Sequence, residues 1–369
     1  MKLHCHRPSL ATAFQIVSGV VPTRTTKDIL KNVKLQVADG KATLIGTDSD
    51  VGIRYEIPGV EIESDGETLL PANRVISILR ELQDDGVDFE ISDNSVCIRS
   101  GHSEFKLSAE DPAEFPVVKA FEEGRHLAVP AKVLQQAIRR TIFSTDVEST
   151  RYALGGILLE LQADALTLAA TDSRRLAVAK VSCRSEGQAE NATPVIPRSA
   201  MSLIEKSIEG DDDSDVLIAV HANDVLVKTN RSTVYSRLVE GRFPNYKDVI
   251  PADSKYTVDL VVAPFYAAVR QAQIVTNEES RGVEFTFSEG NLTLNSRAAD
   301  IGQSKVELPI SFTGDELTIT FDPRFIAEFL RVLDPENQVK LQLTDPEKAA
   351  VFLTDDAYTY VIMPLSRDR

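Results

Sequence analysis

The sequence predicts an α+β protein that repeats one unit of two helices and antiparallel strands three times in tandem. Two observations lead to this fold class. First, Pro71, Pro197 and Pro323 each stand at the start of an amphipathic helix, and the spacing is 126 residues both times. Second, runs of short alternating strands separated by turn residues follow each of these helices, a pattern typical of antiparallel sheets and not of a doubly wound parallel sheet.

Each unit contains a first helix, strands, a second helix and further strands. Proline in the first turn of a helix loses no hydrogen bond, so it marks the start of the second helix in each unit. Clusters of proline, glycine and charge in residues 114–130 and 243–258 separate the units. The predicted helices span residues 7–19, 71–82, 130–143, 197–208, 264–276 and 323–333; strands follow in 41–57, 87–108, 164–180, 216–238, 290–308 and 339–365; and the domains are 1–121, 126–249 and 250–369.

The composition is that of a globular protein of more than one domain, with 369 residues, 43% hydrophobic and 26% charged. No apolar run approaches the roughly 18 residues of a membrane span, and the chain does not begin like a secretory signal. We therefore expect a cytoplasmic protein. Cys5, Cys97 and Cys183 are widely spaced and odd in number, as expected for reduced thiols.

Charge is sorted by element type. The formal net charge is −16, yet the six predicted helices hold eleven basic and three acidic residues, a net of +8, which leaves −24 on the rest of the chain. Solvated helix faces usually mix both signs. A basic surface shared by equivalent helices would suit a phosphate backbone, and the acidic remainder would repel nucleic acid elsewhere. No base-reading motif accompanies the helices, so the expected contact is independent of DNA sequence.

A polar turn interrupts an apolar strand at residues 168–180, where the sequence reads LAATDSRRLAVAK. A catalytic aspartate, a phosphate-binding turn and a hairpin tip all fit locally. The Thr-Asp pair occurs twice, at 47–48 and 171–172, which favours a structural turn in which the aspartate accepts backbone amides. Arg174 and Arg175 occur in the second copy only, and there a functional role is better supported.

The motifs of nucleotide, metal and nucleophilic chemistry are absent from the sequence. His4 and His6 flank Cys5 without a fourth ligand nearby, and the acidic run at 209–215 fits a solvated loop better than a two-metal site. We therefore predict no metal, no cofactor and no catalytic residue. An enzyme acting on nucleotides or phosphorylated substrates, with Asp172 and Arg175 in its site, stays an alternative, as does a monomeric binding module with a basic face.

Three motifs in order give a specific resemblance: ATDSRRLA in the second unit, EGRFPNY at its end and YVIMPL near the C-terminus. With the threefold repeat, they make the whole chain resemble the bacterial sliding clamps, the beta subunits of DNA polymerase III. The resemblance implies the DNA clamp fold, in which two chains pair head to tail into a closed six-domain ring around duplex DNA. It also implies a processivity factor without catalytic activity of its own, associated with the nucleoid during replication.

The resemblance and the helix charges together imply a set of DNA-binding residues on the inner surface and nearby loops. Ala153 and Glu148 depart from the family pattern beside Tyr152. The expected DNA-binding residues are Arg24, Arg74, Arg80, Arg139, Arg140, Tyr152 and Lys206.

The resemblance further implies a pocket for a short Leu/Phe-bearing peptide, a homodimer seam and a set of partners. Arg175 and Leu176 would contact the peptide, while Met363 suits an adaptable surface. Asp248, which stands where a basic residue is common, and the extended tail 366–369 depart from the family pattern. Partners would be double-stranded DNA, the replicative DNA polymerase, the clamp loader and other proteins with such peptides, with no membrane. The pocket residues are Leu154, Thr171, Ser173, Arg174, Arg175, Leu176, Pro244, Val249, Val361, Ile362, Met363, Pro364 and Leu365, and the seam residues are Phe105, Leu107, Ile274 and Val275.

Overall fold

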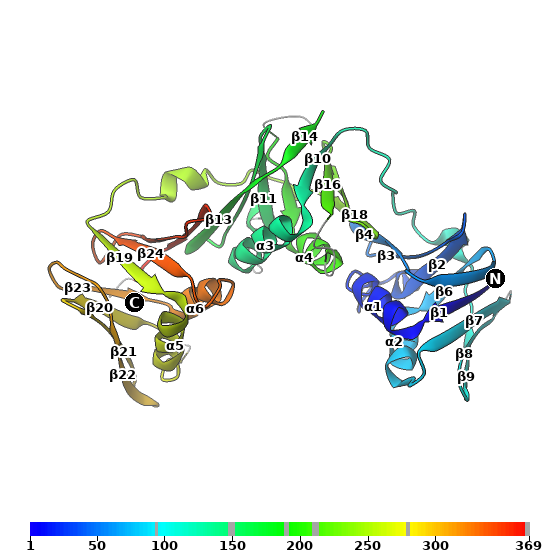
Figure 1. Ribbon diagram of the computed structural model, residues 1–369, viewed down its shortest axis with the longest axis horizontal. Coiled ribbons are helices and arrows are strands. Elements are labelled where there is room, and N and C mark those ends of the chain that lie inside the picture. The colour runs from blue at the N-terminus through cyan, green and yellow to red at the C-terminus, as the bar shows by residue number, and fades with distance from the viewer. Residues whose placement is uncertain (93–94, 147–151, 188–191, 209–213, 278–280, 366–369) are drawn as a thin grey trace. The chain divides into compact units, whose positions relative to one another are not determined.

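A computed structural model describes residues 1–92, 95–146, 152–187, 192–208, 214–277 and 281–365 (Figure 1). The chain forms two compact units. Unit 1 comprises residues 1–135, 162–164 and 183–238, and unit 2 comprises residues 136–161, 165–182 and 239–369. The predicted repeat of two helices and antiparallel strands is confirmed, but the division into compact units cuts through the second copy of the repeat.

Unit 1 begins with a five-stranded antiparallel sheet. Apolar residues alternate along its central strands, and Leu3, Val87, Phe89, Val96 and Ile98 are buried on one face. Its strand order is β5 (Val60–Ser64), β1 (Lys2–His6), β7 (Gly86–Ser92), β8 (Ser95–Ser100) and β9 (Ser103–Ser108).

The second sheet of unit 1 has nine strands and joins the first and second copies of the repeat. The join is an antiparallel pairing of residues 232–236 with residues 51–55, in which Val234 lies opposite Ile53. Its strand order is β14 (Arg184–Glu186), β10 (His126–Pro130), β16 (Asp215–Val220), β17 (Asp224–Lys228), β18 (Ser232–Arg237), β4 (Val51–Glu56), β3 (Lys41–Thr47), β2 (Asn32–Ala38) and β6 (Gly66–Pro71).

Three helices of unit 1 pack together against these strands: α1 (Arg7–Val17), α2 (Ala72–Glu81) and α4 (Arg198–Ser207). Helices α1 and α2 lie side by side (Figure 1). Arg7 ties them, because its Nε donates to the carbonyl of Asp84 at 2.8 Å, just beyond the end of α2. Short elements complete the unit: η1 (Asp28–Lys31), η2 (Pro112–Glu114) and β15 (Val195–Pro197), which precedes α4.

The segment that joins the first two copies of the repeat, residues 115–125, is fastened to the nine-stranded sheet. Phe115 and Val118 are buried in a cluster with Ile45 and Leu69. Val118 packs so closely on the backbone of Gly52 that an added Cβ would lie 2.9 Å from both of its methyl carbons.

Two ion pairs continue this fastening along the same segment. Lys119 Nζ lies 2.9 Å from an Asp224 carboxylate oxygen, and His221 lies between Asp224 (Nδ1 to Oδ1, 2.6 Å) and Glu123 (Nε2 to Oε1, 3.3 Å). The predicted boundary region is therefore held at several points and is not a free linker.

In unit 2, the last strand of the chain pairs with the second copy of the repeat. Residues 175–179 pair antiparallel with residues 358–362, and Leu176 lies opposite Val361. Within unit 2 the strand order of this sheet is β11 (Gly156–Leu161), β12 (Ala165–Thr171), β13 (Arg175–Ser182), β26 (Tyr358–Ile362), β25 (Ala350–Leu353), β24 (Gln338–Leu343) and β19 (Tyr256–Val261).

A four-stranded sheet and two helices complete unit 2. Helices α5 (Val262–Gln273) and α6 (Pro323–Arg331) pack against each other. Phe265, Phe285, Phe329 and Phe352 are buried and form the aromatic centre of the core. The sheet order is β22 (Gly302–Pro309), β21 (Asn291–Ala298), β20 (Val283–Ser288) and β23 (Leu317–Phe321), and the remaining elements are η3 (Ile142–Ser144), η4 (Tyr152–Gly155) and η5 (Tyr246–Val249).

All six predicted helices are confirmed, the remaining one being α3 (Ala131–Thr141). Each observed helix begins within two residues of its predicted start and keeps the charged residues assigned to it. The three cysteines are free, as expected, with Cys5 and Cys183 buried. None of the helices that the structure describes is long and apolar enough to cross a membrane.

Candidate functional site

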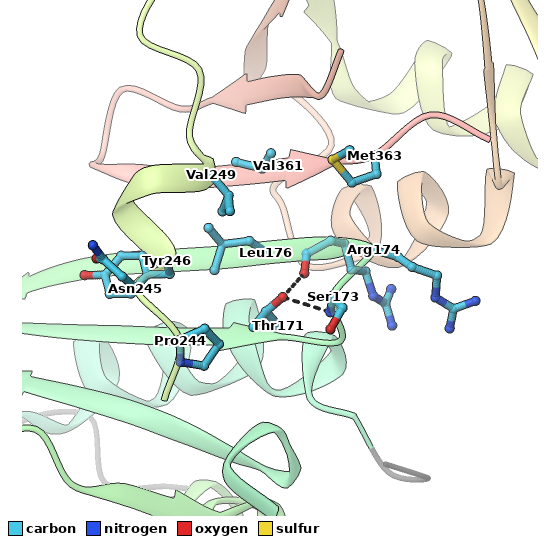
Figure 2. Close-up of a pocket in the computed structure, with 11 residues that line it drawn as sticks. Thr171, Ser173, Arg174, Leu176, Pro244, Asn245, Tyr246, Val249, Val361 and Met363 are labelled. Atoms are coloured by element: carbon cyan, nitrogen blue, oxygen red, sulfur yellow. Dashed lines mark hydrogen bonds between the residues drawn. The ribbon is translucent and has the colours of Figure 1, made fainter. Parts of the chain in front are cut away.

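A pocket of about 230 Å³ opens on unit 2 between three segments that are distant in sequence (Figure 2). One wall is the β12–β13 turn, the second is the segment around η5, and the third is the C-terminal end of β26. The lining is mostly apolar, with a few polar groups at the edge, as is typical of ligand sites. The lining residues are Thr171, Ser173, Arg174, Arg175, Leu176, Pro244, Asn245, Tyr246, Val249, Val361 and Met363.

The β12–β13 turn is built by its own side chains. Thr171 Oγ1 donates to the carbonyl of Arg175 at 2.6 Å and accepts from the amide of Ser173 at 3.1 Å. Asp172 Oδ1 accepts from the amides of Arg174 and Arg175, both at 3.0 Å. Ser173 adopts a φ of +72°, which is uncommon for a residue with a side chain. The hydrogen bonds made by Thr171 and Asp172 hold the turn in this conformation. The turn therefore holds Leu176 in place at the start of β13.

The first copy of the repeat contains the same turn. Thr47 Oγ1 donates to Val51 at 2.7 Å, and Asp48 Oδ1 accepts from the amides of Asp50 and Val51 at 2.9 and 2.7 Å. Ser49 has a φ of +89°. The structural interpretation of the Thr-Asp pair is thus confirmed in both copies.

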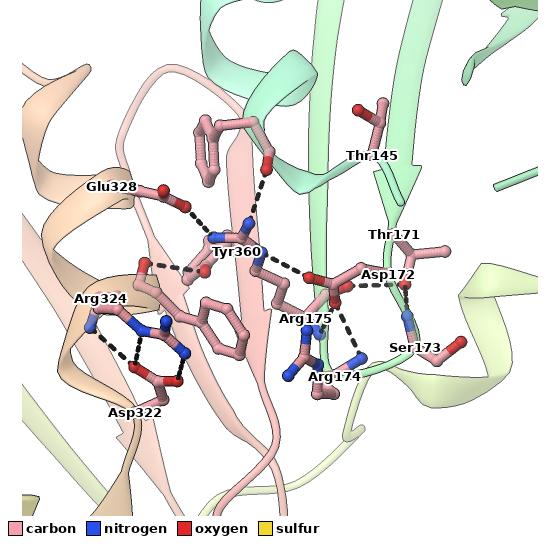
Figure 3. A network of polar contacts seen from close by, with 12 residues as sticks. Thr145, Thr171, Asp172, Ser173, Arg174, Arg175, Asp322, Arg324, Glu328 and Tyr360 are labelled. Atoms are coloured by element: carbon pink, nitrogen blue, oxygen red, sulfur yellow. Dashed lines mark hydrogen bonds and ion pairs between the residues drawn. The ribbon is translucent and has the colours of Figure 1, made fainter. Parts of the chain in front are cut away.

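Arg175 lies at the centre of a buried polar network behind the pocket (Figure 3). Its side chain is 8% exposed, its Nε donates to Asp172 Oδ2 at 3.0 Å, and its Nη2 donates to the carbonyl of Phe143 at 2.6 Å. Nη1 donates to the carboxylate of Glu328 on α6. Arg175 lines the pocket, where a peptide contact was predicted, but its guanidinium is turned into unit 2 and fastens the pocket wall to α6.

The second wall is held from behind by Glu160 on β11. The hydroxyl of Tyr246 donates to Glu160 Oε2 at 2.7 Å, and Lys247 Nζ lies 2.7 Å from Glu160 Oε1. Burial alone would raise the pKa of Glu160, but these two donors and the charge of Lys247 outweigh it and lower the pKa. Pro244 and Val249 were predicted for this wall, whereas Asn245 and Tyr246 were missed, although both stand between them in the sequence.

The third wall is the end of β26, where side chains alternate across the strand. Val361 and Met363 face the pocket, and Met363 is 45% exposed. Four predicted pocket residues do not line it. Ile362 and Leu154 are buried in the core, and Leu365 is drawn away because its amide donates to the carbonyl of Thr320 at 2.8 Å. Pro364 also lies outside the lining.

Five of the seven predicted DNA-binding residues have exposed side chains, as a phosphate contact requires: Arg24, Arg74, Arg80, Arg139 and Lys206. The backbone of Tyr152 begins η4, but its side chain lies outside the described residues, as does Glu148.

Arg140 requires a correction. Its side chain is buried, Nη1 lies 2.7 Å from Asp356 Oδ2, and the guanidinium stacks over the ring of Tyr358 at 5.0 Å. The hydroxyl of Tyr358 also donates to the carbonyl of Arg140 at 2.6 Å. Arg140 therefore belongs to the core of unit 2, and its charge is not available to DNA.

The basic helices keep a positive exposed surface after this correction. Arg7 and Arg324 are also paired internally, with the carbonyl of Asp84 and with the carboxylate of Asp322. Of the three acidic helix residues, only Glu81 is exposed. Seven basic helix residues are exposed: Arg74, Arg80, Lys132, Arg139, Lys206, Arg270 and Arg331.

The predicted seam residues lie on an edge strand of unit 1 and just after a helix of unit 2. Phe105 and Leu107 are half-buried on one face of β9, the edge strand of its sheet. Ile274 follows α5 and is 77% exposed, and Val275 is half-buried. In the described part of the chain, no group of three or more His, Cys, Asp or Glu residues is placed to hold a metal ion.

Known proteins match this sequence over nearly the whole chain. Models of the N-terminal, central and C-terminal domains of the DNA polymerase III beta subunit match residues 1–119, 128–245 and 247–366. The beta sliding clamp of Escherichia coli K12 is 29% identical over 370 residues, with 99% of this chain and 100% of that protein covered.

Solved structures give the same result. The Bacillus subtilis DNA polymerase sliding clamp is 28% identical with a TM-score of 0.89, and 99% of each chain is covered. The Pseudomonas aeruginosa sliding clamp bound to griselimycin is 27% identical with a TM-score of 0.89, again covering 99% of each chain.

Proposed function

The chain belongs to the beta subunit family of DNA polymerase III, the beta sliding clamps, and we propose that it encircles duplex DNA as a head-to-tail homodimer and tethers partner proteins through the pocket on unit 2. Members of this family are processivity factors, accessory subunits of the polymerase without a catalytic site. Partners would be the replicative polymerase, the clamp loader and repair proteins that carry a short apolar peptide. The observation that carries the proposal is the full-length match together with an apolar pocket built from the second and third copies of the repeat.

The electrostatics of the exposed helix residues support loose contact with a phosphate backbone. A helix of about 12 residues is about 18 Å long, and duplex DNA presents one charge per about 1.7 Å, or about ten charges over that length. Two copies of the chain would bring twice the seven exposed basic helix residues, a number similar to that of the DNA charges over the same length. Because these positive charges lie on long side chains and no base-reading motif accompanies them, they would centre the duplex and still permit sliding.

The alternative of a nucleotide-processing enzyme has no support in the site geometry. The carboxylate of Asp172 is occupied by two backbone amides and by Arg175, and Asp48 makes the same amide contacts in the first copy. A general base needs an acceptor within reach of a substrate proton, whereas the side chain of Asp172 is 8% exposed and already accepts three hydrogen bonds.

A topological experiment tests the proposal. The protein would be loaded onto nicked circular DNA by a clamp loader, and the fraction retained would be measured by gel filtration before and after the circle is cut. A ring that encloses DNA stays on the circle and leaves the linear molecule by sliding off its ends. Equal retention on both forms would contradict encirclement, and loss from both at low salt would contradict DNA binding.

A further inference from the structure

Strand β19 has an unpaired edge at a place where the other two copies of the repeat have a strand. The strands β1, β10 and β19 are equivalent, because each leads directly into the first helix of its copy. Strand β5 pairs with β1, and β14 pairs with β10, both antiparallel. Strand β19 pairs with β24 on one side only and ends its sheet (Figure 1).

The segment that corresponds to β5 and β14 in the third copy takes another course. It comprises residues 310–316, between β22 and β23. The amide of Ile310 and the carbonyl of Phe312 are both bonded to Gly290 in the β20–β21 turn. The segment reaches β19 through side chains at Tyr256, the first residue of the strand, whose ring centroid lies 5.3 Å from that of Phe312. It therefore does not pair with the rest of β19.

Alternate amides of β19 point to the unpaired edge, because hydrogen bonding alternates between the two sides of a strand. The amide of Val262 continues the ladder with β24 and donates to the carbonyl of Asn337 at 3.0 Å. The even-numbered residues of β19 are thereby assigned to β24, and the odd-numbered amides point away from it. Within the described chain no acceptor bonds to these three amides, which are those of Thr257, Asp259 and Val261.

Strand β1 shows the same edge when it is paired. Lys2 is equivalent to Thr257, and its amide points toward β5 and donates to Ser64 Oγ at 3.0 Å. The pairing continues with Ile62 of β5 opposite the buried Leu3 of β1. An added strand thus satisfies the edge amides and places apolar side chains beside the buried face.

The charge of Asp259 indicates what an added strand should carry. Asp259 is the one charged residue of β19, its side chain is exposed, and none of the described residues forms an ion pair with it. The equivalent positions of an added strand are filled by Glu61 in β5 and by Arg184 in β14. A basic side chain opposite Asp259 would be favourable, whereas two copies of β19 paired around Asp259 would place two carboxylates opposite each other.

Strand β19 lacks most of the features that keep an edge strand from pairing. It is six residues long, contains no proline, and stays in regular register with β24 over all six residue pairs. In the second copy, by contrast, Pro130 occupies the position equivalent to Val261 and has no amide hydrogen to donate. The edge of β19 is therefore open to an added strand along Thr257–Val261.

We infer that the free edge of β19 is a second docking surface, which binds an extended segment of a partner protein as an added antiparallel strand. The segment would alternate apolar, basic and apolar residues. Its basic side chain would lie opposite Asp259, and its apolar side chains would lie on the face of Val258 and Leu260, as Ile62 lies on the face of Leu3. None of the residues that line the pocket belongs to β19, so this surface goes beyond the proposed function.

Three synthetic peptides with blocked ends test the inference. They comprise residues 58–65 of this chain, which include β5, with Glu61 kept or replaced by Gln or Arg. Exchange of individual amides of the full-length protein would be followed by NMR, and peptide affinity by fluorescence polarisation. In the unbound protein, the amide of Asp259 should exchange at least about tenfold faster than that of His4, its paired equivalent. The Arg peptide should slow this exchange and bind about two- to fivefold tighter than the Glu peptide.

Variants separate charge, backbone and pocket contributions. Asp259→Lys should reverse the order of the Arg and Glu peptides. Val261→Pro, which copies Pro130 of the second copy, should weaken all three peptides about fivefold, because it removes one edge amide. Glu284→Lys makes the same charge change on an exposed side chain of β20, which is paired on both edges, and should keep the wild-type order. Met363→Ala, which changes the pocket, should keep it as well.

Three results would overturn the inference and leave the proposed function intact. The first is unchanged exchange of the Asp259 amide with every peptide at about 1 mM. The second is the wild-type peptide order in Asp259→Lys. The third is loss of binding in Met363→Ala, which would place the peptides in the pocket.

The unbound protein gives a further check on what covers the edge. An Asp259 amide that already exchanges as slowly as that of His4 would contradict an open edge. If this protection falls on dilution, a second copy of the chain covers β19; if it does not, the chain covers its own edge.

Discussion

The backbone amide of Met363 donates a 2.8 Å hydrogen bond to the carbonyl oxygen of Arg174. This bond extends the β13–β26 pairing one step beyond Ile362, so the end of the chain and the β12–β13 turn meet in a fixed register. Two pocket walls are therefore strand backbone already bonded to each other. A peptide would bind to a preformed surface and would not have to order the walls, which lowers the entropic cost of binding.

Met363→Ala should weaken peptide binding without weakening the fold. Met363 is 45% exposed, so truncation removes little core packing, and we expect a change below about 1 kcal/mol in the free energy of unfolding. Lost apolar contact should lower peptide affinity about tenfold. Fluorescence polarisation and urea unfolding measure the two effects, and Val117→Ala, which truncates a 94% exposed side chain in unit 1, is the control.

Leu176→Ala should weaken both binding and stability. Leu176 is 2% exposed, and truncation of a buried leucine costs about 2–5 kcal/mol. Loss of polymerase tethering in this variant alone would therefore not identify the pocket. Unchanged processive synthesis with both variants would remove the pocket assignment.

Arg175→Met should destabilise unit 2, because it leaves the nearly buried Asp172 carboxylate without its charged partner. We expect a loss of about 3–5 kcal/mol in the free energy of unfolding. The double variant Asp172→Asn/Arg175→Met should recover part of that loss, since the asparagine oxygen can still accept the two turn amides. A loss below about 1 kcal/mol in the single variant would mean that the network does not hold the wall.

Adjacent arginines on α3 should give opposite results. Arg139 is exposed, so Arg139→Gln should reduce the salt dependence of DNA binding by about one unit of slope and change stability by less than about 0.5 kcal/mol. Arg140→Gln removes a buried pair with Asp356 and should cost about 1–3 kcal/mol of stability while keeping the slope. Salt titrations of DNA binding and urea unfolding of both variants would settle the assignment, and a reduced slope in Arg140→Gln would contradict it.

The His221 contacts should stabilise unit 1 in mildly acidic solution. The hydrogen bond with Asp224 raises the pKa of His221, helped by Glu123 and the two negative charges, although burial opposes it. A raised folded-state pKa means that this stability is fully present below the unfolded value of about 6.5 and is lost as the pH rises through the folded value. Asp224 stays ionised in that range. Burial raises the pKa of Asp224, but the hydrogen bonds from Lys119 and His221 outweigh burial, so that the pKa is lowered overall.

The measurement is the melting temperature of wild type and His221→Gln from about pH 5 to about pH 8.5. The difference should be largest in acid and correspond to less than about 1 kcal/mol, because the side chains are partly exposed. His102→Gln, which removes an exposed histidine that has no ion-pair partner among the described residues, is the matched control. A difference that grows with pH would have the wrong sign for this contact.

The repeat and its helices were predictable because they depend on local chemistry. Pro71, Pro197 and Pro323 mark helix starts through a backbone constraint that needs no tertiary information. Helix α5 begins two residues before its predicted start, since Pro264 is tolerated anywhere in the first turn. Strand partners at sheet edges were not predictable, because alternation gives the faces of β4 and β18 but not which edge each strand joins.

The site was predictable in outline and not in its details. Arg140 lies three residues after Ala137, which places it beside the apolar stripe of α3, and helical periodicity could have separated it from Arg139. Asn245 and Tyr246 had no such signal, because they lie in a segment without periodicity, which is held at the pocket by tertiary contacts such as the bonds of Tyr246 and Lys247 to Glu160.

Ring closure should fail in Ile274→Asp. Ile274 is 77% exposed in unit 2, so the aspartate costs the isolated chain little, but at a head-to-tail seam against Phe105 and Leu107 of a second copy it would bury an unpaired charge. We expect the dimer dissociation constant to rise at least about a hundredfold. Sedimentation velocity over a concentration series measures it, and negative-stain images at submicromolar protein should show six-lobed rings for wild type and single-chain particles for the variant.

Val117→Asp places the same charge on a 94% exposed position away from the predicted seam and should keep the rings. Rings in both variants would move the seam elsewhere, whereas single chains in wild type at every concentration would leave only a monomeric basic-faced binder, since heterologous contacts enclose DNA only when two copies close the ring.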